Sequence, residues 1–179
     1  MSRGKARAVA VSIEDRRTDE WRERAAALGG DRLRYLSSKR FGEYSNEELG
    51  KFRIITDVYG GLSYTERLSA FMEKVLAVLE VNGDFYSLLQ SVRLDNGLDD
   101  PQTTWYQTEL KDALGRDVKV CSWLKRISCV QVTCESKSGW DTPSELFHVR
   151  KVCNEVSVPR MTPLQFEAGN PPSRVFQIH

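Results

Sequence analysis

The chain has 179 residues, a length that suits one domain of ordinary size. Hydrophobic residues make up 40% and charged residues 28%, so the chain is too apolar to be disordered. Lysine and arginine number 26 against 25 acidic residues, and the formal net charge of +1 argues against a general nucleic-acid binder. No apolar stretch approaches the ~20 residues that cross a bilayer. The composition predicts a cytoplasmic protein that does not enter the membrane.

The four cysteines lie in the C-terminal third of the chain and include no Cys-x-x-Cys pair. With only two histidines in the sequence, this spacing predicts no metal site. We expect three of the cysteines to be small buried hydrophobic residues, because they stand among Val, Ile, Leu and Trp. A nucleophilic pair of Cys153 and His148 stays open, although a five-residue spacing on an expected helix directs the two side chains apart.

Short apolar runs alternate with helical patterns along the first half of the chain, which is typical of a parallel α/β sheet. Strands are predicted over residues 6–13, 32–36, 52–58 and 84–92. Helices are predicted from Thr18 to a stop at Gly29-Gly30, around 46–49, and from Ser63 to Asn82. The last of these has apolar residues at three- and four-residue steps, and Ser63-x-x-Glu66 forms a capping box at its start.

The second half carries shorter signals. We predict a helix over 104–114, strands over 118–123 and 127–134, and a last strand over 174–178. Thr142-Pro143-Ser144-Glu145 combines a capping box with a proline in the first helical turn, so a helix is predicted from there to about Asn154.

This order of elements predicts an α/β fold with a Rossmann-like, mostly parallel sheet and helices on both faces. The runs over 6–13, 52–58 and 84–92 are expected to be neighbouring or near-neighbouring strands of its core. Ligands of such sheets bind beyond the carboxyl ends of the strands. The segments over 12–15, 37–39 and 57–61 are therefore the candidates for a functional site.

These segments, in this order, resemble the central part of a class I S-adenosylmethionine-dependent methyltransferase. The run Phe52 to Tyr64, FRIITDVYGGLSY, looks like the family's fourth strand, which ends in an acid or polar residue beside the methyl donor. The run Val75 to Phe85 is similar to the helix and L-K-P-G-G entry into the fifth strand, with Val81-Asn82 in place of Lys-Pro and Asp84 in place of the second glycine.

The resemblance covers residues 6–92 well and the rest loosely. It implies one methyltransferase-like domain over 1–179, with 5–92 as the best-matching core and 93–179 as C-terminal strands and helices on the acceptor side. Within that second part, the segments over 101–105 and 140–144 are expected to line the acceptor site, because insertions beyond strand ends usually set specificity.

The resemblance also implies cofactor-binding residues. An acid at the end of the family's second strand accepts both ribose hydroxyls, and this position falls near Ser12, followed by Glu14 and Asp15. Glu14 is the favoured ribose ligand, while capping of the next helix by the two acids is an equally open interpretation. Ser37 and Ser38 would lie near the adenine, against the alternative of an ordinary polar loop.

Asp57 is the leading single candidate, both as a cofactor-binding and as a catalytic residue. It ends a strand before a Gly-Gly turn and has no obvious helix to cap, because Ser63 is expected to do that. Tyr59 and Tyr64 would shape the catalytic site with it. The alternative for each tyrosine alone is a half-buried ring with its hydroxyl at the surface.

One motif of the family is missing from the sequence. Its glycine-rich E/D-x-G-x-G-x-G loop lets backbone N–H groups approach the methionine end of the cofactor, and a Cβ would block that approach. Gly29-Gly30 and Gly60-Gly61 are turn pairs at other positions. The chain thus resembles a methyltransferase that begins one strand and one helix late: the half-unit was removed, is supplied by another chain, or is lost. We expect weak binding of S-adenosylmethionine, and either a homo-oligomer or a partner chain that completes the sheet.

The leading hypothesis is a methyltransferase, or the larger part of one, with a small-molecule acceptor. The alternative is a non-catalytic binding or regulatory module on a degenerate methyltransferase scaffold. A third interpretation is another α/β protein, such as a nucleotide-binding or response-regulator-like domain. Against the third, the sequence lacks a P-loop and a cluster of acids for magnesium.

Overall fold

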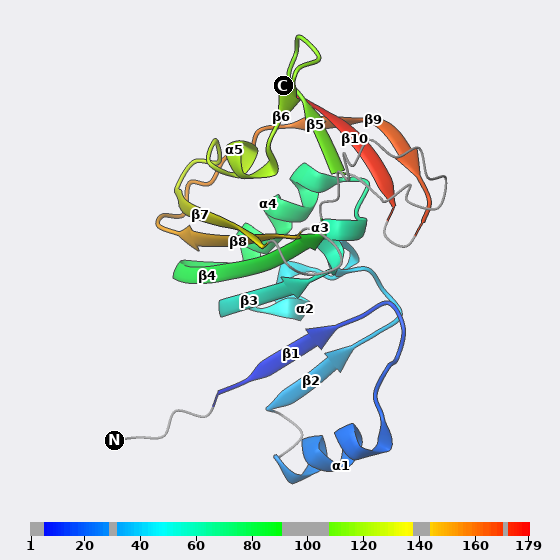
Figure 1. Ribbon diagram of the computed structural model, residues 1–179. Helices are drawn as coiled ribbons and strands as arrows, with labels where there is room; N and C mark the ends of the chain where they lie inside the picture. The colour runs from blue at the N-terminus through cyan, green and yellow to red at the C-terminus, as the bar shows by residue number, and fades with distance from the viewer. Residues whose placement is uncertain (1–5, 29–31, 91–107, 138–143, 170–171) are drawn as a thin grey trace. The chain divides into compact units, whose positions relative to one another are not determined.

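The computed structural model describes residues 6–28, 32–90, 108–137, 144–169 and 172–179 (Figure 1). The chain divides into two compact units, Met1–Gly50 and Lys51–His179, and each is described here by itself. The predicted organisation as one domain over 1–179 stays a prediction. Both units combine helices with strands, so the α/β fold class is confirmed.

The first unit is a small parallel sheet with its crossover helix. Strand β1 (Ala8–Val11) pairs in parallel with β2 (Leu33–Leu36), and helix α1 (Asp19–Ala27) connects them. The Thr18 hydroxyl accepts a hydrogen bond from the Trp21 N–H at 3.2 Å and thereby caps α1, so the predicted helix start at Thr18 is confirmed. A 3₁₀ turn, η1 (Phe41–Glu43), and helix α2 (Asn46–Leu49) complete the unit.

The second unit contains a four-stranded sheet in the order β3-β4-β8-β7. Its strands are β3 (Phe52–Val58), β4 (Leu79–Gln90), β8 (Ser144–Lys151) and β7 (Val130–Lys137). The pair β3–β4 is parallel, so the predicted neighbourhood of the runs over 52–58 and 84–92 is confirmed. The run over 6–13 forms β1 of the other sheet, where it pairs with β2. The expectation that all three runs share one sheet is therefore wrong for the described part of the chain.

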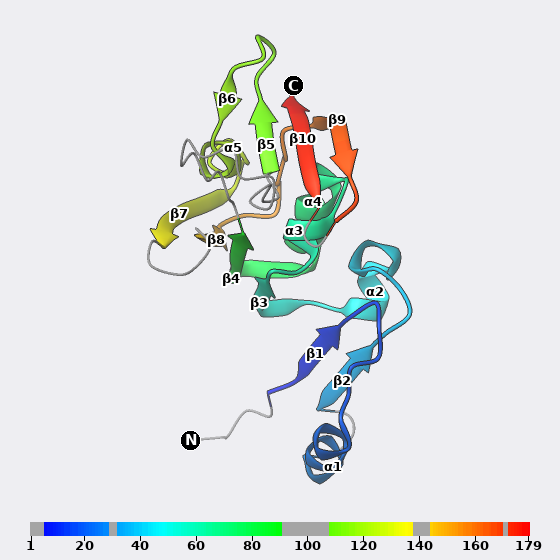
Figure 2. The ribbon, with the colours of Figure 1, turned by 45° about the vertical axis from the view of Figure 1, so that its right-hand side comes forward.

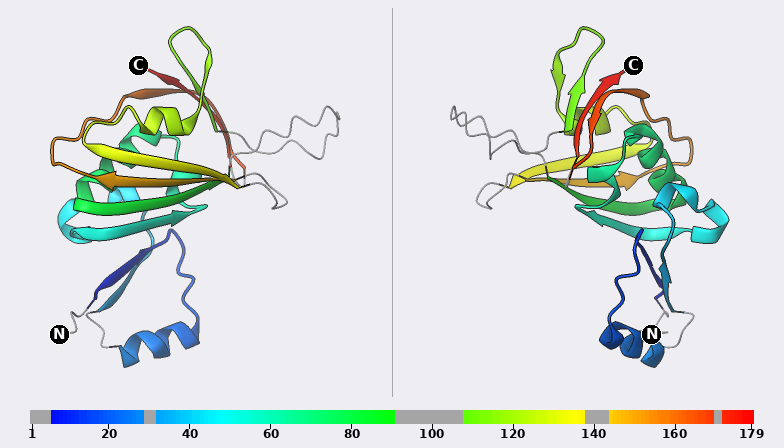
Figure 3. Two further views of the ribbon diagram at one scale, coloured as in Figure 1. Left: turned by 60° about the vertical axis from the view of Figure 1, so that its left-hand side comes forward. Right: turned by 90° about the vertical axis from the view of Figure 1, so that its right-hand side faces the viewer.

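A second four-stranded sheet has the order β6-β5-β10-β9. Its strands are β5 (Thr108–Lys111), β6 (Asp117–Val118), β10 (Ser173–Ile178) and β9 (Met161–Glu167). Helices α3 (Gly61–Tyr64) and α4 (Leu68–Val78) lie between the two four-stranded sheets, as Figures 1, 2 and 3 show from different sides. Over the described residues, three strand pairs are parallel and four are antiparallel, so the pairing is more mixed than the sequence indicated.

The core of the second unit forms around α4. Its side chains at three- and four-residue spacing, Leu68, Met72, Val75 and Leu76, are buried, which confirms the predicted periodicity. One face of the sheet packs toward this helix through Phe85 and its cross-strand neighbour Val149. The contacts bury a continuous apolar layer, which is the main stabilising contribution to this unit.

Four predictions for the elements are wrong. Thr108–Lys111 is a strand and not part of a helix over 104–114, of which 104–107 lie outside the described residues. The predicted strand over 118–123 is mostly helix α5 (Val120–Leu124), and residues 144–151 of the helix predicted from Thr142 to about Asn154 form strand β8. Ser63 is buried inside α3 and does not cap the long helix, which begins after Arg67.

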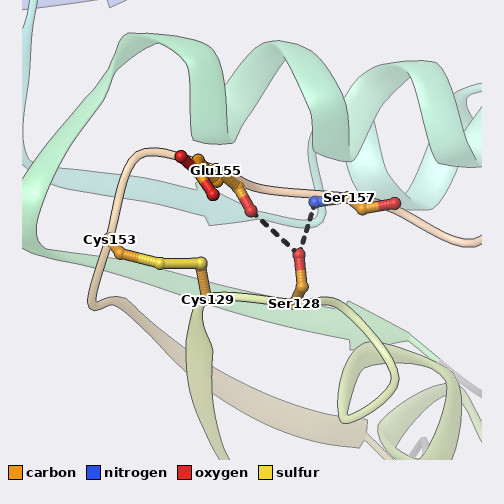
Figure 4. Close-up of a disulfide and its surroundings, with 5 residues drawn as sticks. All are labelled: Ser128, Cys129, Cys153, Glu155 and Ser157. Atoms are coloured by element: carbon orange, nitrogen blue, oxygen red, sulfur yellow. Dashed lines mark hydrogen bonds between the residues drawn. A yellow bond between two sulfur atoms is a disulfide. The ribbon is translucent and has the colours of Figure 1, made fainter.

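All four cysteines form disulfides, which corrects the expectation that three of them are simply small buried hydrophobic residues. Cys121 of α5 pairs with Cys134 of β7 (Cα–Cα 6.2 Å), and Cys129 pairs with Cys153 after β8 (Cα–Cα 5.1 Å; Figure 4). Beside the second bridge, the Ser128 hydroxyl accepts from the Ser157 N–H at 2.7 Å. Both bridges attach segments to the β7–β8 pair.

The disulfide also removes the proposed nucleophile pair of Cys153 and His148. The thiol of Cys153 is consumed, and His148 has other partners. Its Nε2 lies 2.8 Å from the Asp84 carboxylate, and its ring stacks on Tyr86 at a centroid distance of 4.6 Å. No helix among the described residues is long and apolar enough to cross a membrane.

Candidate functional site

The carboxyl end of β3 is organised around Asp57. The Leu62 N–H donates to Asp57 Oδ2 at 3.0 Å, and the Ser87 hydroxyl of the neighbouring strand lies 3.4 Å from the same oxygen. The Gly61 N–H also donates to this carboxylate. A Cβ at Gly60 would clash with the Asp57 carboxylate, so the turn requires glycine there. Asp57 thus caps the N-terminus of α3, and the expectation that it has no helix to cap is wrong.

Arg174 of β10 lies under the same turn and is completely buried. Its guanidinium donates to the carbonyl oxygens of Thr65 at 2.5 Å and Leu62 at 2.9 Å, and to the Thr108 hydroxyl at 2.5 Å. The Nε atom of Arg174 and the hydroxyl of Ser63 are buried without a hydrogen-bond partner among the described residues. The turn is therefore held from one side by a carboxylate and from the other by a guanidinium.

Burial governs the charges of this pair. Removal from water disfavours the carboxylate and raises the pKa of Asp57, and the N–H groups of Leu62 and Gly61 oppose that shift only in part. Burial likewise lowers the pKa of Arg174 to about 10, against the attraction of Asp57. Arg174 therefore stays charged at neutral pH and favours the ionised form of Asp57.

The two candidate tyrosines stand on either side of this turn. Tyr59 has a backbone φ of 48°, a conformation that is uncommon for an aromatic residue, and its N–H donates to the Leu88 carbonyl at 3.0 Å. Tyr64, at the end of α3, has 41% of its surface exposed. Strained backbone persists where the surrounding structure over-determines it and clusters at functional sites. The Asp57-held turn and its two tyrosines make up the candidate site of the second unit.

The candidate residues of the first unit lie at the carboxyl ends of β1 and β2, and the parallel pairing brings these ends together. The Ser38 N–H donates to the Ile13 carbonyl at 3.0 Å, and the Ser37 carbonyl accepts from the Tyr44 hydroxyl at 2.9 Å. Ser38 has a positive φ of 78°. The segment that holds the two serines is thus hydrogen-bonded to the segment that follows β1.

The two acids after β1 differ in their environment. Glu14 pairs with Arg16 at 3.1 Å, and both side chains are largely exposed. Asp15 pairs with Arg17 at 2.6 Å and with Arg22 at 3.6 Å. The hydrogen bond from Arg17 holds the pKa of Asp15 well below its usual range. Glu14 is therefore free to exchange its partner for a ligand, whereas Asp15 is committed to its arginines.

The residues at the carboxyl ends of β1 and β2 fit the ribose of the expected cofactor better than its methionine end. The exposed Glu14 carboxylate can accept two hydroxyl hydrogens, and the strand-end serines supply further polar groups. The oxygens of Asp57 are already engaged by the α3 turn, so that residue fits the role of shaping the backbone between Tyr59 and Leu62.

The segments expected to line the acceptor site, 101–105 and 140–144, lie outside the described residues except for Ser144. No group of three metal-ligating side chains occurs in the described parts.

Sequence reasoning missed Arg174 and Ser87. The signal for Arg174 was present, since R-x-F-x-I places the arginine on the same face as Phe176 and Ile178, both of which are buried. In the same way Ser87 alternates with Phe85 and Leu89 on the buried face of β4. A polar residue on an apolar strand face indicates a buried partner, and in both cases that partner belongs to the Asp57 turn.

Comparison with known proteins gives a structural match. Neither protein-family models nor curated proteins match the chain. Among solved structures, it is similar to a "putative rRNA-methylase" from Clostridium thermocellum, with a TM-score of 0.51 and 14% identity over 82% of this chain and 75% of that one. It is also similar to an rRNA methylase from Streptococcus thermophilus (TM-score 0.48, 14% identity, 82% and 74%) and to the antibiotic-resistance methyltransferase Kmr (TM-score 0.48, 15% identity, 82% and 76%).

At 14–15% sequence identity, the similarity to these structures concerns the fold alone. The match at a TM-score of 0.51 agrees with the sequence resemblance around FRIITDVYGG and with the observed strand, turn and helices at that position. The α/β, Rossmann-like fold predicted from the sequence is confirmed. The chain has the fold of a class I S-adenosylmethionine-dependent methyltransferase.

Proposed function

We propose that the chain is a methyltransferase, or the larger part of one, that uses S-adenosylmethionine and has its active site at the carboxyl end of β3. The observation that carries the proposal is the Asp57 turn. A half-buried acid at a strand end fixes the following backbone through the N–H groups of Leu62 and Gly61, in a chain with the methyltransferase fold. Ligands of open α/β sheets bind at this end of the strands.

Methyl transfer depends mainly on placement, because the donor holds its methyl group in an activated form. In the proposal, Asp57 and Arg174 hold the turn rigid, and Tyr59 and Tyr64 position the acceptor. The Tyr59 backbone is kept at its φ of 48° by the Leu88 carbonyl, so its side chain has a defined direction at the strand end. S-adenosylmethionine supplies the methyl group, and the chain supplies orientation.

Glu14 is proposed as the ligand of the ribose hydroxyls, with Ser37 and Ser38 on the adenine side. The support is its exposed carboxylate at the end of a parallel strand beside those serines. We propose a small-molecule acceptor, since the balanced charge of +1 offers no general attraction to a nucleic-acid backbone. Because similar structures are described as rRNA methylases, ribosomal RNA is the substrate against which a small-molecule acceptor should be compared. A cytoplasmic location belongs to the same proposal, although cytosolic proteins rarely keep disulfides such as the two in this chain.

The test uses saturation-transfer NMR, which detects weak ligands, with S-adenosylhomocysteine as the probe. We expect transfer to the adenine and ribose protons, and its loss in Glu14→Gln. Asp15→Asn is the matched control: it removes the same charge one residue away, but from a carboxylate already committed to Arg17 and Arg22. Equal loss in both variants, or none in Glu14→Gln, would contradict the assignment. Incubation with labelled S-adenosylmethionine and either ribosomal RNA or a metabolite extract then identifies the acceptor class.

A further inference from the structure

The hydroxyl of Tyr35, on strand β2, holds the loop that follows β1. It accepts a hydrogen bond from the Arg16 N–H at 3.2 Å and donates one to the Glu14 carbonyl at 3.1 Å. These two backbone groups stand on either side of Asp15. A single side-chain hydroxyl therefore joins the two ends of a three-residue turn and attaches that turn to the neighbouring strand.

The backbone hydrogen bonds between the two strands reach only as far as the start of this loop. The Ser12 N–H donates to the Leu36 carbonyl at 3.0 Å, and the Ser38 N–H donates to the Ile13 carbonyl at 3.0 Å. At Ile13 and Glu14 the backbone bends on its way to helix α1. The Tyr35 hydroxyl thus continues the attachment to β2 beyond the bonds of the backbone ladder.

The ring of Tyr35 is itself held by the loop and by α1. Trp21 of α1 meets it edge to face at a centroid distance of 5.5 Å. The Arg17 guanidinium lies 5.1 Å from the centroid of the Tyr35 ring, and the Asp15 carboxylate holds this guanidinium at 2.6 Å. All of these residues belong to the unit Met1–Gly50, so the position of the hydroxyl is set within that unit.

Arg16 connects the Tyr35 hydroxyl to the carboxylate of Glu14. The Nε and Nη2 atoms of Arg16 lie 3.2 Å and 3.1 Å from Glu14 Oε2, so both contacts fall on one of the two carboxylate oxygens. An exposed ion pair of this kind contributes little stability and does not by itself fix two long side chains. Because Tyr35 binds the backbone of both residues, the carboxylate is presented in a narrower range of positions.

We propose that Tyr35 is a positioning residue for Glu14: its hydroxyl fixes the Glu14–Arg16 backbone so that the Glu14 carboxylate meets the hydroxyls of a ribose. The inference rests on the proposed function, in which Glu14 binds the ribose of S-adenosylmethionine. A carboxylate that accepts from both hydroxyls of a vicinal diol must be held in one orientation. Ordering the loop beforehand lowers the conformational entropy that is lost when the ligand binds.

The first experiment compares adenosine with 2′-deoxyadenosine, which differ only in the 2′-hydroxyl, by NMR titration of the full chain. We expect the parent to bind adenosine roughly tenfold more tightly, because the deoxy ligand lacks one hydrogen bond to a charged group. In Tyr35→Phe this preference should fall roughly three- to tenfold, with little change in the affinity for 2′-deoxyadenosine. A general structural defect would instead weaken both ligands equally and leave the preference unchanged.

Two further variants act as controls. Tyr44→Phe removes another tyrosine hydroxyl of the same unit, which donates to the Ser37 carbonyl at 2.9 Å, and should keep the preference for adenosine. In the Glu14→Gln background, Tyr35→Phe should have no further effect on the preference, because the residue through which it acts is already altered. An unchanged preference in Tyr35→Phe, an equal fall in Tyr44→Phe, or additive effects in the double variant would overturn the inference.

The second experiment measures hydrogen exchange of the Arg16 amide without ligand, so that failure of the inference can be told from failure of the proposed function. Exchange should be at least about threefold faster in Tyr35→Phe than in the parent, and unchanged in Tyr44→Phe. An unchanged rate in Tyr35→Phe would contradict the inference even if the parent binds adenosine. A parent that binds neither nucleoside nor S-adenosylhomocysteine would contradict the proposed cofactor site, and the inference with it.

Discussion

Asp57 and Arg174 bind the two backbone groups of one residue in the α3 turn, the N–H and the carbonyl of Leu62. The Asp57 carboxylate accepts from the N–H of Leu62 at 3.0 Å, and the Arg174 guanidinium donates to the carbonyl of Leu62 at 2.9 Å. Residues 117 positions apart in the sequence thus fix one turn at the end of β3. Because Arg174 is buried and Asp57 is half-buried, neither can lose its partner to water without cost.

The first prediction concerns Arg174. Arg174→Ala leaves the carbonyls of Leu62 and Thr65 without their donor and Asp57 without its nearby charge, so the free energy of unfolding should fall by roughly 3–5 kcal/mol. Urea unfolding followed by tryptophan fluorescence measures it. Arg160→Ala, at an exposed position, is the control and should stay within about 0.5 kcal/mol of the parent. Similar values for both variants would contradict the role assigned to the buried guanidinium.

The second prediction is a pH dependence due to Asp57. Burial raises its pKa in the folded state above the ordinary 3.8, so the folded state binds this proton more tightly than the unfolded state does. The resulting stabilisation is fully present below pH 3.8 and is lost as pH rises through the folded-state pKa. Asp57→Asn keeps an acceptor for the Leu62 N–H and removes the titration. As pH rises through that window, the parent should therefore lose stability relative to Asp57→Asn. A difference in unfolding free energy between the two that stays constant with pH would be inconsistent with burial as the cause.

The third prediction concerns Lys151, which is buried at the end of α4. Its Nζ donates to the carbonyls of Leu76 at 2.8 Å and Leu79 at 3.0 Å and so satisfies the last turn of that helix. Lys151→Met keeps the apolar stem but leaves these acceptors unpaired, which should cost about 1–3 kcal/mol of stability. Lys125→Met at an exposed position is the comparison. Thermal unfolding of both should separate them clearly, and equal melting temperatures would show that the two carbonyls find other donors.

The fourth prediction tests the disulfides. The denatured protein should show no free thiol before reduction and four after it, because both bridges are formed. Replacing Cys129 and Cys153 together by serine opens a loop of 24 residues and should remove about 3 kcal/mol of stability in the chain-entropy account. Thiol titration and chemical unfolding are the measurements. Four free thiols in freshly isolated protein would instead support the reduced cysteines that the sequence suggested.

The sequence predicted the elements that depend on local pattern. FRIITDV before Tyr-Gly-Gly predicted β3 with the observed bounds, and the apolar spacing from Leu68 to Leu76 predicted α4. The strand β8 was mistaken for a helix because Thr142-Pro143-Ser144-Glu145 is a strong local helix start. In the fold, the buried Phe147 and Val149 alternate with less buried residues and pair with both β4 and β7, so tertiary pairing overrides the capping signal.

The sequence predicted only part of the candidate site, again because local patterns do not reveal tertiary contacts. Asp57 could be singled out because it ends a strand before Gly60-Gly61, but its role as a helix cap required the short α3, which the expected cap at Ser63 concealed. Arg174 joins the site from a distant strand, and a contact across so much sequence has no local pattern beyond its place on a buried strand face.

The most direct test of the central claim is a calorimetric titration of the chain with S-adenosylhomocysteine, repeated on Asp57→Ala and on Tyr59→Phe. The account predicts weak binding, with a dissociation constant on the order of 1 mM, because the sequence lacks the glycine-rich loop that would add several backbone hydrogen bonds of roughly 0.5–1.5 kcal/mol each. It also predicts that Asp57→Ala abolishes the heat of binding, since the turn loses its cap, while Tyr59→Phe retains it. No binding by the parent chain, or binding unchanged in Asp57→Ala, would contradict a cofactor site at the end of β3.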